Sequence, residues 1–157
     1  MKFQTIGNPN DSLIIMLPGS FCPSSGLNYL YEKLKDDYCI VLVEYNGHYE
    51  NSTFSSRQNE AKGIVEYIQK QNIHTIKMIY GQSMGAEIAI ELFKQLEKTN
   101  INVDYCFLDG APCIKLPYLY KKFMHFKFNQ ILKMMKKKEV DQILNMKLIK
   151  KIARGNT

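Results

Sequence analysis

Residues 76–87 constrain the fold of this chain more than any other part of its sequence. A short apolar run, residues 76–80, leads into a turn with the pattern G-x-S-x-G at residues 81–85, and a run with helical periodicity follows. Glycine on each side of a serine relieves steric overlap in a strained strand-to-helix turn. Such a turn places the Ser83 hydroxyl at the amino end of a helix, where free N–H groups favour negative charge. The pattern predicts a nucleophilic serine, and its alternative is an ordinary serine in a glycine-rich turn.

The strand, turn and helix around Ser83 resemble the nucleophile elbow of the α/β-hydrolase family. Two further turns extend the resemblance. Residues 18–21, which follow the apolar run 12–17, resemble the family's His-Gly-x loop, with Pro18 in place of the usual histidine. Residues 44–52 resemble its D-x-x-G-H-G-x-S turn, with glutamate for aspartate and tyrosine for the second glycine.

The resemblance implies roles for particular residues. Ser83 would be the nucleophile, and the backbone N–H groups of Met84 and Ser20 would form the oxyanion hole, with Phe21 as the second candidate for the Ser20 position. His48 would have a structural role in its loop. A plain strand-to-helix turn is the alternative for residues 18–21.

Apolar runs and helical patterns alternate along the first part of the chain, and this alternation predicts an α/β fold. We expect buried strands at residues 13–17, 39–43, 76–80 and 105–108, a short edge strand at 2–6, and helices at about 27–37, after Ser55 or Ser56, and after the elbow. The fold class is a parallel sheet with helices on both faces, an incomplete α/β-hydrolase fold with a helical lid-like tail. In the family order, strand 39–43 lies beside 13–17, strand 76–80 on its other side and strand 105–108 next. The Ser20 loop and the elbow then border the same crevice.

Charge divides the chain near residues 112–117. Residues 1–114 hold nine Lys/Arg and thirteen Asp/Glu, which gives −4, whereas residues 115–157 hold twelve and two, which gives +10. We therefore predict a hydrolase-like core at 1–114 and a basic helical lid segment at 115–157, with amphipathic helices at about 116–135 and 140–152. The alternative for this segment is simple packing of helices on the core.

A nucleophilic serine needs a base to take its proton and a carboxylate to orient that base. In the resembled family both usually follow later strands, which lie beyond Thr157 in this register. We therefore expect a truncated hydrolase chain that lacks the catalytic histidine. Asp109 is a possible acid, because some family members place it after this strand, and His125 is a possible base from the lid.

The remaining expectations concern partners and location. We expect a small-molecule acyl substrate, no cofactor, no metal, no nucleic acid and no membrane span. The four cysteines show no C-x-x-C spacing, and the amino terminus lacks the apolar run of a signal peptide, so we expect reduced thiols and a cytoplasmic protein. Two other functions stay open: a non-catalytic hydrolase-like binding or interaction protein, and a basic-helix module that binds an acidic membrane surface or nucleic acid. The sequence leaves the substrate and the oligomeric state open.

Overall fold

The computed structural model describes residues 1–111 and 117–135. The chain divides into two compact units, Met1–Pro112 and Cys113–Thr157. The elements of the first unit, in chain order, are β1 (Lys2–Ile6), β2 (Leu13–Leu17), the 3-10 helix η1 (Ser24–Leu27), α1 (Asn28–Tyr31), β3 (Cys39–Glu44), α2 (Arg57–Lys70), β4 (Thr75–Gln82), α3 (Met84–Leu96) and β5 (Asn102–Asp109). The second unit contains α4 (Tyr118–Met135).

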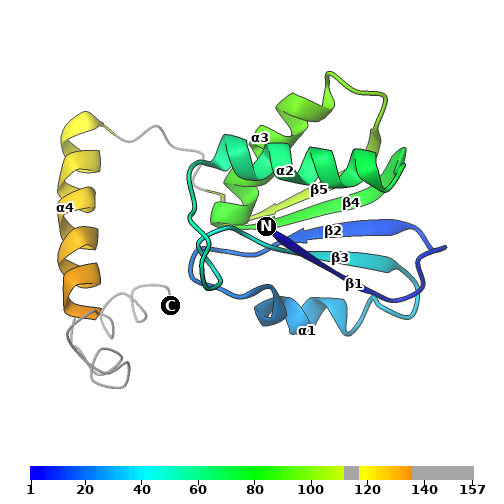
Figure 1. The fold of residues 1–157 in the computed structure, drawn as a ribbon, viewed down its shortest axis with the longest axis horizontal. Coiled ribbons are helices and arrows are strands. Elements are labelled where there is room, and N and C mark those ends of the chain that lie inside the picture. Colours follow the sequence, from blue (N-terminus) through cyan, green and yellow to red (C-terminus); the bar gives the residue numbers. More distant parts are fainter. Residues whose placement is uncertain (112–116, 136–157) are drawn as a thin grey trace. The chain divides into compact units, whose positions relative to one another are not determined.

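The five strands form one sheet in the order β1-β3-β2-β4-β5 (Figure 1). Strands β3, β2, β4 and β5 run parallel, and β1 pairs antiparallel with β3. Helices α2 and α3 cover one face, and the short α1 lies on the other (Figure 1). The predicted fold class and strand order are confirmed.

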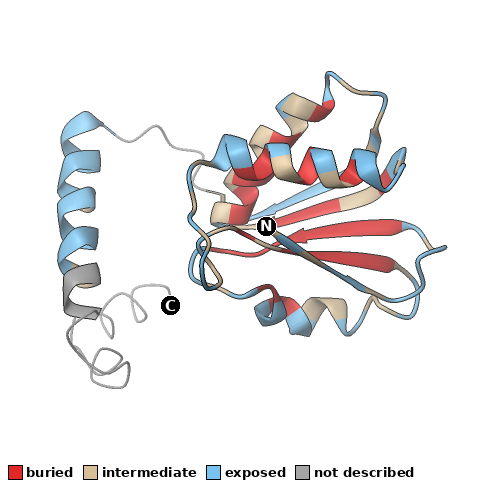
Figure 2. Cartoon of the chain, viewed as in Figure 1, coloured by how far each residue is buried: buried red, intermediate tan, exposed pale blue. Residues whose placement is uncertain are grey.

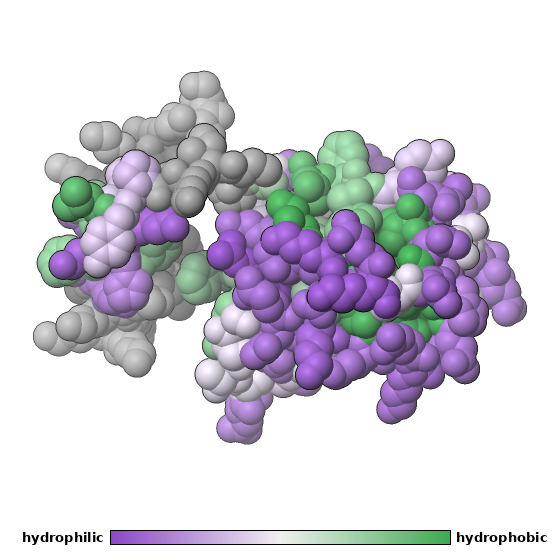
Figure 3. All heavy atoms as spheres, turned by 90° about the horizontal axis from the view of Figure 1, so that it is seen from above, coloured by the Kyte–Doolittle hydropathy of each residue, from purple (hydrophilic) through white to green (hydrophobic). Residues whose placement is uncertain are grey.

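The core lies on both faces of the three inner strands, β3, β2 and β4, and every residue of β2 is buried. One face packs against α2 and α3, and the other against η1 (Figure 2). The first face contains Ile15, Leu17, Val41, Val43, Ile64, Ile68, Ile88 and Leu92, and the second contains Ile14, Met16, Leu27, Ile40, Leu42 and Tyr80. Burial on both faces explains why β2 and β3 read as continuous apolar runs. The surface seen from above is mostly hydrophilic, with smaller hydrophobic areas (Figure 3).

Helix α2 begins where the sequence predicts. The Ser56 hydroxyl accepts a hydrogen bond from the Asn59 N–H at 3.1 Å, which satisfies one of the free donors at the helix start. The apolar stripe of α2 is buried; it consists of Ala61, Ile64, Val65 and Ile68. Glu60 is buried as well, at 1% exposure, and its carboxylate accepts hydrogen bonds from the backbone N–H and the side-chain amide of Asn46, both at 3.1 Å. This carboxylate ties α2 to the loop after β3.

Two predictions about the first unit are wrong. The helix expected at residues 27–37 is only a 3-10 turn and the four-residue α1, followed by turns. The strand expected to be buried at 105–108 is exposed: Tyr105 is 62% exposed and Phe107 is 60% exposed. The physical reason is its position, since β5 is an edge strand of this sheet and the short α1 does not extend across to it (Figure 2).

Helix α4 confirms the first amphipathic helix predicted for the second part of the chain, at Tyr118–Met135. Several of its large apolar side chains are exposed: Tyr118, Leu119, Tyr120, Phe123, Phe126 and Phe128. The second predicted helix, at residues 140–152, lies outside the described residues, and the lid interpretation of residues 115–157 stays a prediction. Within the described part of the chain, no helix combines the length and the hydropathy that crossing a membrane requires.

We expect Ser56→Ala to lower the free energy of unfolding by about 1 kcal/mol, because it leaves the Asn59 N–H without its acceptor. Ser55→Ala is the matched control, since the Ser55 hydroxyl accepts only from the Asn59 side chain, at 2.9 Å. Urea unfolding of both variants measures the difference. Equal losses in the two variants would contradict the capping role of Ser56.

Candidate active site

The predicted elbow is the turn between β4 and α3. Ser83 has φ 50° and ψ −113°, a left-handed conformation that a residue with a side chain rarely adopts. Its carbonyl accepts from the Ala86 N–H at 3.0 Å, and its own N–H donates to the Asp109 carbonyl at 2.7 Å. The side chain of Ser83 is exposed and does not cap α3. The predicted backbone strain at Ser83 is confirmed.

Two glycines allow α3 to begin so close to the sheet. A side chain at Gly81 would lie 2.7 Å from the Gly85 carbonyl oxygen and from the Ala86 Cα atom. A side chain at Gly85 would overlap the carbonyl groups of Leu17 and Pro18, at the end of β2. The glycines are therefore required by close contacts with the backbone at the start of α3 and at the end of β2.

The loop after β2 lies against the elbow. A side chain at Gly19 would lie 3.5 Å from the Ser83 Cβ atom, which shows how closely the two turns approach. The Cys22 N–H donates to the Gly19 carbonyl at 3.3 Å and closes a tight turn, in which Phe21 has φ 58° and is 74% exposed. Within the described residues, no hydrogen bond uses the backbone N–H of Ser20 or of Met84. Both predicted oxyanion donors thus belong to turns that meet at Ser83.

A polar cluster that the sequence analysis missed lies beside the elbow. The Tyr80 hydroxyl donates to the Asp109 carboxylate at 2.9 Å, and the Tyr29 hydroxyl is 3.5 Å from the Tyr80 hydroxyl. The Gln82 amide donates to Tyr29 at 3.4 Å. Burial, together with the hydrogen bonds to Tyr29 and Asp109, raises the pKa of Tyr80 well above its usual value. The period of two along β4 could have indicated this cluster, because Tyr80 and Gln82 share one face of the strand.

Glu44 joins the loop after β3 to the loop after β2. Its carboxylate accepts from the Ser24 N–H at 2.9 Å, and its other oxygen lies 3.9 Å from the His48 Nδ1 atom. The His48 ring meets the Tyr45 ring edge-on, with 5.4 Å between the ring centres. A cavity of about 250 Å³ opens between these loops, lined by Phe21, Cys22, Pro23, Glu44, Gly47 and His48. These contacts position the two loops relative to each other.

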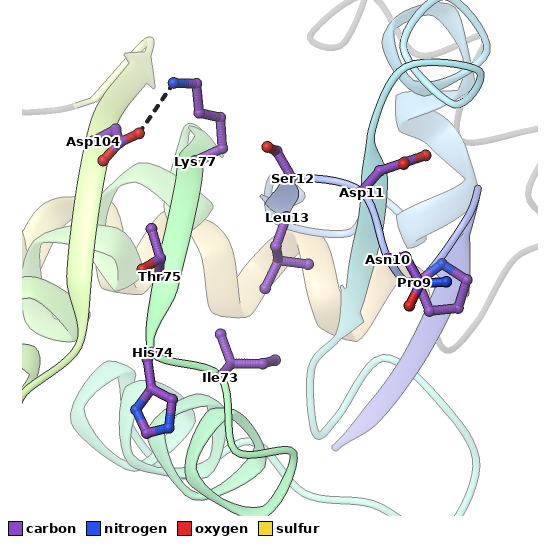
Figure 4. Close-up of a pocket in the computed structure, with 10 residues that line it drawn as sticks. All are labelled: Pro9, Asn10, Asp11, Ser12, Leu13, Ile73, His74, Thr75, Lys77 and Asp104. Carbon is purple, nitrogen blue, oxygen red and sulfur yellow. Dashed lines mark hydrogen bonds and ion pairs between the residues drawn. The ribbon is translucent and has the colours of Figure 1, made fainter.

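A larger cavity, of about 350 Å³, lies at the opposite end of the strands (Figure 4). It is bordered by Leu13 and Thr75, where β2 and β4 begin, and by the ion pair of Lys77 and Asp104 at 3.0 Å. Ligands of open α/β sheets bind at the carboxyl ends of the strands. For this reason we place the candidate site at Ser83 and not in this cavity.

The structure therefore brings together some of the predicted residues. Ser83 and Met84 in the elbow, the loop that contains Ser20, and Asp109 at the end of β5 lie at the carboxyl ends of neighbouring strands. His125 lies in α4 of the second unit, where its Nδ1 atom is 3.2 Å from the Asn129 amide. Among the described residues, no group of three or more His, Cys, Asp or Glu side chains could hold a metal ion.

Comparison with solved structures identifies the architecture. An α/β-hydrolase family protein from Desulfitobacterium hafniense is similar, with a TM-score of 0.72 and 20% identity over 88% of this chain and 56% of that one. A marine microorganism esterase has a TM-score of 0.67 and 23% identity, over 84% of this chain and 50% of that one. MenH from S. aureus has a TM-score of 0.71 and 15% identity, over 91% and 55% of the two chains. No protein-family model matches the sequence, and a comparison with curated proteins gives no match.

The fold is therefore a part of the α/β-hydrolase fold, as the sequence predicted. This chain spans about half the length of the solved hydrolases that it resembles, and its sheet corresponds to a part of theirs. At these identities the likeness establishes the fold.

We expect Gly85→Ala to destabilise the protein by about 3 kcal/mol, because the added methyl group overlaps the carbonyls at the end of β2. Gly63→Ala is the matched control. Gly63 lies inside α2, and a methyl group there meets only the flexible end of Met1, at 3.2 Å, so the better helix propensity of alanine should stabilise by about 0.5–1 kcal/mol. Opposite signs in thermal melts are the expected result. Equal stability of Gly85→Ala and the parent protein would contradict the close approach of α3 to β2.

Tyr80→Phe should cost about 1 kcal/mol at neutral pH, since it removes the hydrogen bond to Asp109. Because the pKa of Tyr80 is raised on folding, the stabilisation is fully present below the unfolded pKa of about 10 and is lost as the pH rises toward the folded value. The difference in unfolding free energy between parent and variant should therefore shrink above that pH. Tyr67→Phe is the control, because no hydrogen bond in the described residues involves the Tyr67 hydroxyl. A difference that grows with pH would contradict the raised pKa of Tyr80.

Proposed function

We propose that this chain is part of a serine hydrolase that cleaves an ester, thioester or amide of a small acyl substrate through Ser83. The observation that carries the proposal is the strained, exposed Ser83 at the amino end of α3, held against β2 by Gly85. One protein of the same fold is named as an esterase, which supports an acyl substrate.

The proposed reaction uses the geometry of the two turns. The Ser83 oxygen attacks the carbonyl carbon of the substrate while a base removes the hydroxyl proton, and the carbonyl oxygen becomes an oxyanion. The backbone N–H groups of Met84 and Ser20 donate to that oxyanion, and the helix dipole at the amino end of α3 further stabilises its negative charge. The bond from the carbonyl carbon to the leaving group then breaks, and the leaving group takes the proton from the base. Water releases the acyl group by the same steps.

The base is the part of this machinery that we place outside the chain of 157 residues. Of its three histidines, His74 precedes β4, so it is separated from Ser83 by the length of an eight-residue strand, about 25 Å. His48 follows β3, and β2 lies between β3 and β4, so two strand spacings of about 10 Å in total separate the two turns. His125 in α4 stays the alternative base.

Asp109 is the proposed acid. It follows β5, and its carbonyl accepts from the Ser83 N–H at 2.7 Å, so its backbone is fixed beside the elbow. Its carboxylate already accepts a hydrogen bond from Tyr80. An ionised carboxylate has room for further donors, so it could orient a base as well.

Labelling with a fluorophosphonate probe tests the proposal. We expect the chain of 157 residues to react slowly, because a serine hydroxyl without a base is a weak nucleophile, and we expect the adduct to map to Ser83 by mass spectrometry. Added imidazole should accelerate the labelling in proportion to its concentration, because it replaces the missing base. Ser83→Ala should abolish both the adduct and the imidazole effect, whereas Ser20→Ala should keep them, since it retains the backbone N–H.

Three outcomes would change the conclusion. Fast labelling without imidazole, lost in Ser83→Ala and in His125→Ala or His48→Ala, would show that the base lies within this chain. Modification of other serines with Ser83 left unmodified would contradict its role as nucleophile. No labelling of Ser83 even with imidazole, combined with binding of an acyl compound, would favour a non-catalytic binding protein.

A further inference from the structure

The loop that carries Ser20 contains a strained turn. The Cys22 N–H donates to the Gly19 carbonyl at 3.3 Å, and Phe21, the third residue of this turn, has φ 58°. Ser20, the second residue, does not have a positive φ, so the turn has the pattern of type II, which favours glycine where Phe21 lies. A residue with a side chain keeps such a conformation only when the surrounding structure fixes it. The contacts that fix this turn therefore decide where the Ser20 N–H points.

The turn is held from both sides. At its start, a side chain at Gly19 would lie 3.5 Å from the Ser83 Cβ atom, so the turn begins against the elbow. After its end, the Ser24 N–H donates to the Glu44 carboxylate at 2.9 Å, and Ser24 is buried. A hydrogen bond to an ionised carboxylate is stronger than one between neutral groups. Pro23, with φ −64°, lies between the turn and Ser24, and its ring leaves this link little freedom.

Glu44 is well placed to hold the loop. It is the last residue of β3, which pairs with β2, and its side chain is only 18% exposed. The length of this side chain matters, because the resembled turn of the hydrolase family has aspartate at this position. The carboxylate of an aspartate would lie one methylene group, about 1.5 Å, farther from the Ser24 N–H, which is outside hydrogen-bond distance. The glutamate of this chain therefore makes a contact that the shorter residue would not make from the same backbone.

We infer that Glu44 is a positioning residue for the oxyanion hole: by holding Ser24, it keeps the strained turn closed and the Ser20 N–H directed at the oxyanion formed at Ser83. The inference rests on the proposed function. Glu44 does not touch the substrate and acts through the backbone between Ser24 and Ser20. A donor displaced by about 1 Å loses much of its effect, so release of Ser24 should slow the attack by Ser83. It should not abolish the attack, because the Met84 N–H remains.

Fluorophosphonate labelling of Ser83 at a fixed imidazole concentration measures this effect. We expect Glu44→Ala and Glu44→Asp to lower the labelling rate by about tenfold. Glu44→Gln should stay within about threefold of the parent, because its amide oxygen can still accept from the Ser24 N–H. Glu50→Ala is the matched control: this exposed glutamate lies in the same loop after β3, and its loss should leave the rate unchanged. Circular dichroism checks that each variant is folded, and the comparison of Glu44→Asp with Glu44→Gln decides if Glu44→Ala is not.

A double-mutant cycle separates positioning from a general loss of stability. Ser20→Pro removes the backbone N–H of residue 20, and proline is common at the second position of a type II turn, so the turn itself should be kept. If Glu44 acts through this N–H, Glu44→Asp should slow labelling about tenfold in the parent but no further in Ser20→Pro. Equal losses in the two backgrounds would overturn the inference, and so would a labelling rate of Glu44→Asp equal to that of the parent.

Amide hydrogen exchange distinguishes failure of the inference from failure of the proposed function. We expect the Ser24 amide to be protected in the parent and in Glu44→Gln, and to exchange at least tenfold faster in Glu44→Asp. Equal exchange of the Ser24 amide in the parent and in Glu44→Asp would overturn the inference even if Ser83 is labelled. A parent protein that is not labelled at Ser83 with imidazole would instead contradict the proposed function, and the role of Glu44 in an oxyanion hole with it.

Discussion

The close approach of α3 to the sheet is the constraint on which the rest of this structure depends. Gly81 and Gly85 leave no space for side chains between the start of α3 and the ends of β4 and β2. The short path from β4 into α3 forces Ser83 into a left-handed conformation, and no side chain caps the helix start. The amino end of α3 therefore keeps free N–H groups beside the exposed hydroxyl of Ser83. A packing requirement of the core and the chemistry proposed for Ser83 share one cause.

The sequence predicted the features that depend on local pattern. Continuous apolar runs predicted β2 and β3, and the order of the elements predicted the parallel sheet. Ser55 or Ser56 predicted the start of α2, because a capping hydroxyl acts within three residues of itself, and Ser56 is the cap. The two glycines around Ser83 predicted the elbow. The pattern G-x-S-x-G predicted that side chains are excluded at Gly81 and Gly85. It could not predict that the backbone of α3 and of β2 occupies the space that these side chains would need.

Features that depend on distant residues could not be predicted. Glu60, in the first turn of α2, is buried because the loop after β3 brings Asn46 to its carboxylate, and no local pattern indicates this burial. The hydrogen bond from Tyr80 to Asp109 joins residues 29 positions apart. The apolar run 105–108 was interpreted as buried because its side chains are hydrophobic. Hydropathy shows that such side chains favour burial, but it does not show which residues cover them. A strand at a sheet edge has the same composition as a central strand until its neighbours are known.

The least covered strand of the sheet is also the one that supports the candidate site. The Ser83 N–H donates to the Asp109 carbonyl, and Gln82 pairs with Asp109 in the register of β4 and β5. The elbow is thus held by β2 on one side, through Gly85, and by the end of β5 on the other. The end of β5 and the strained turn are therefore connected directly, through the hydrogen bond between the Ser83 N–H and the Asp109 carbonyl.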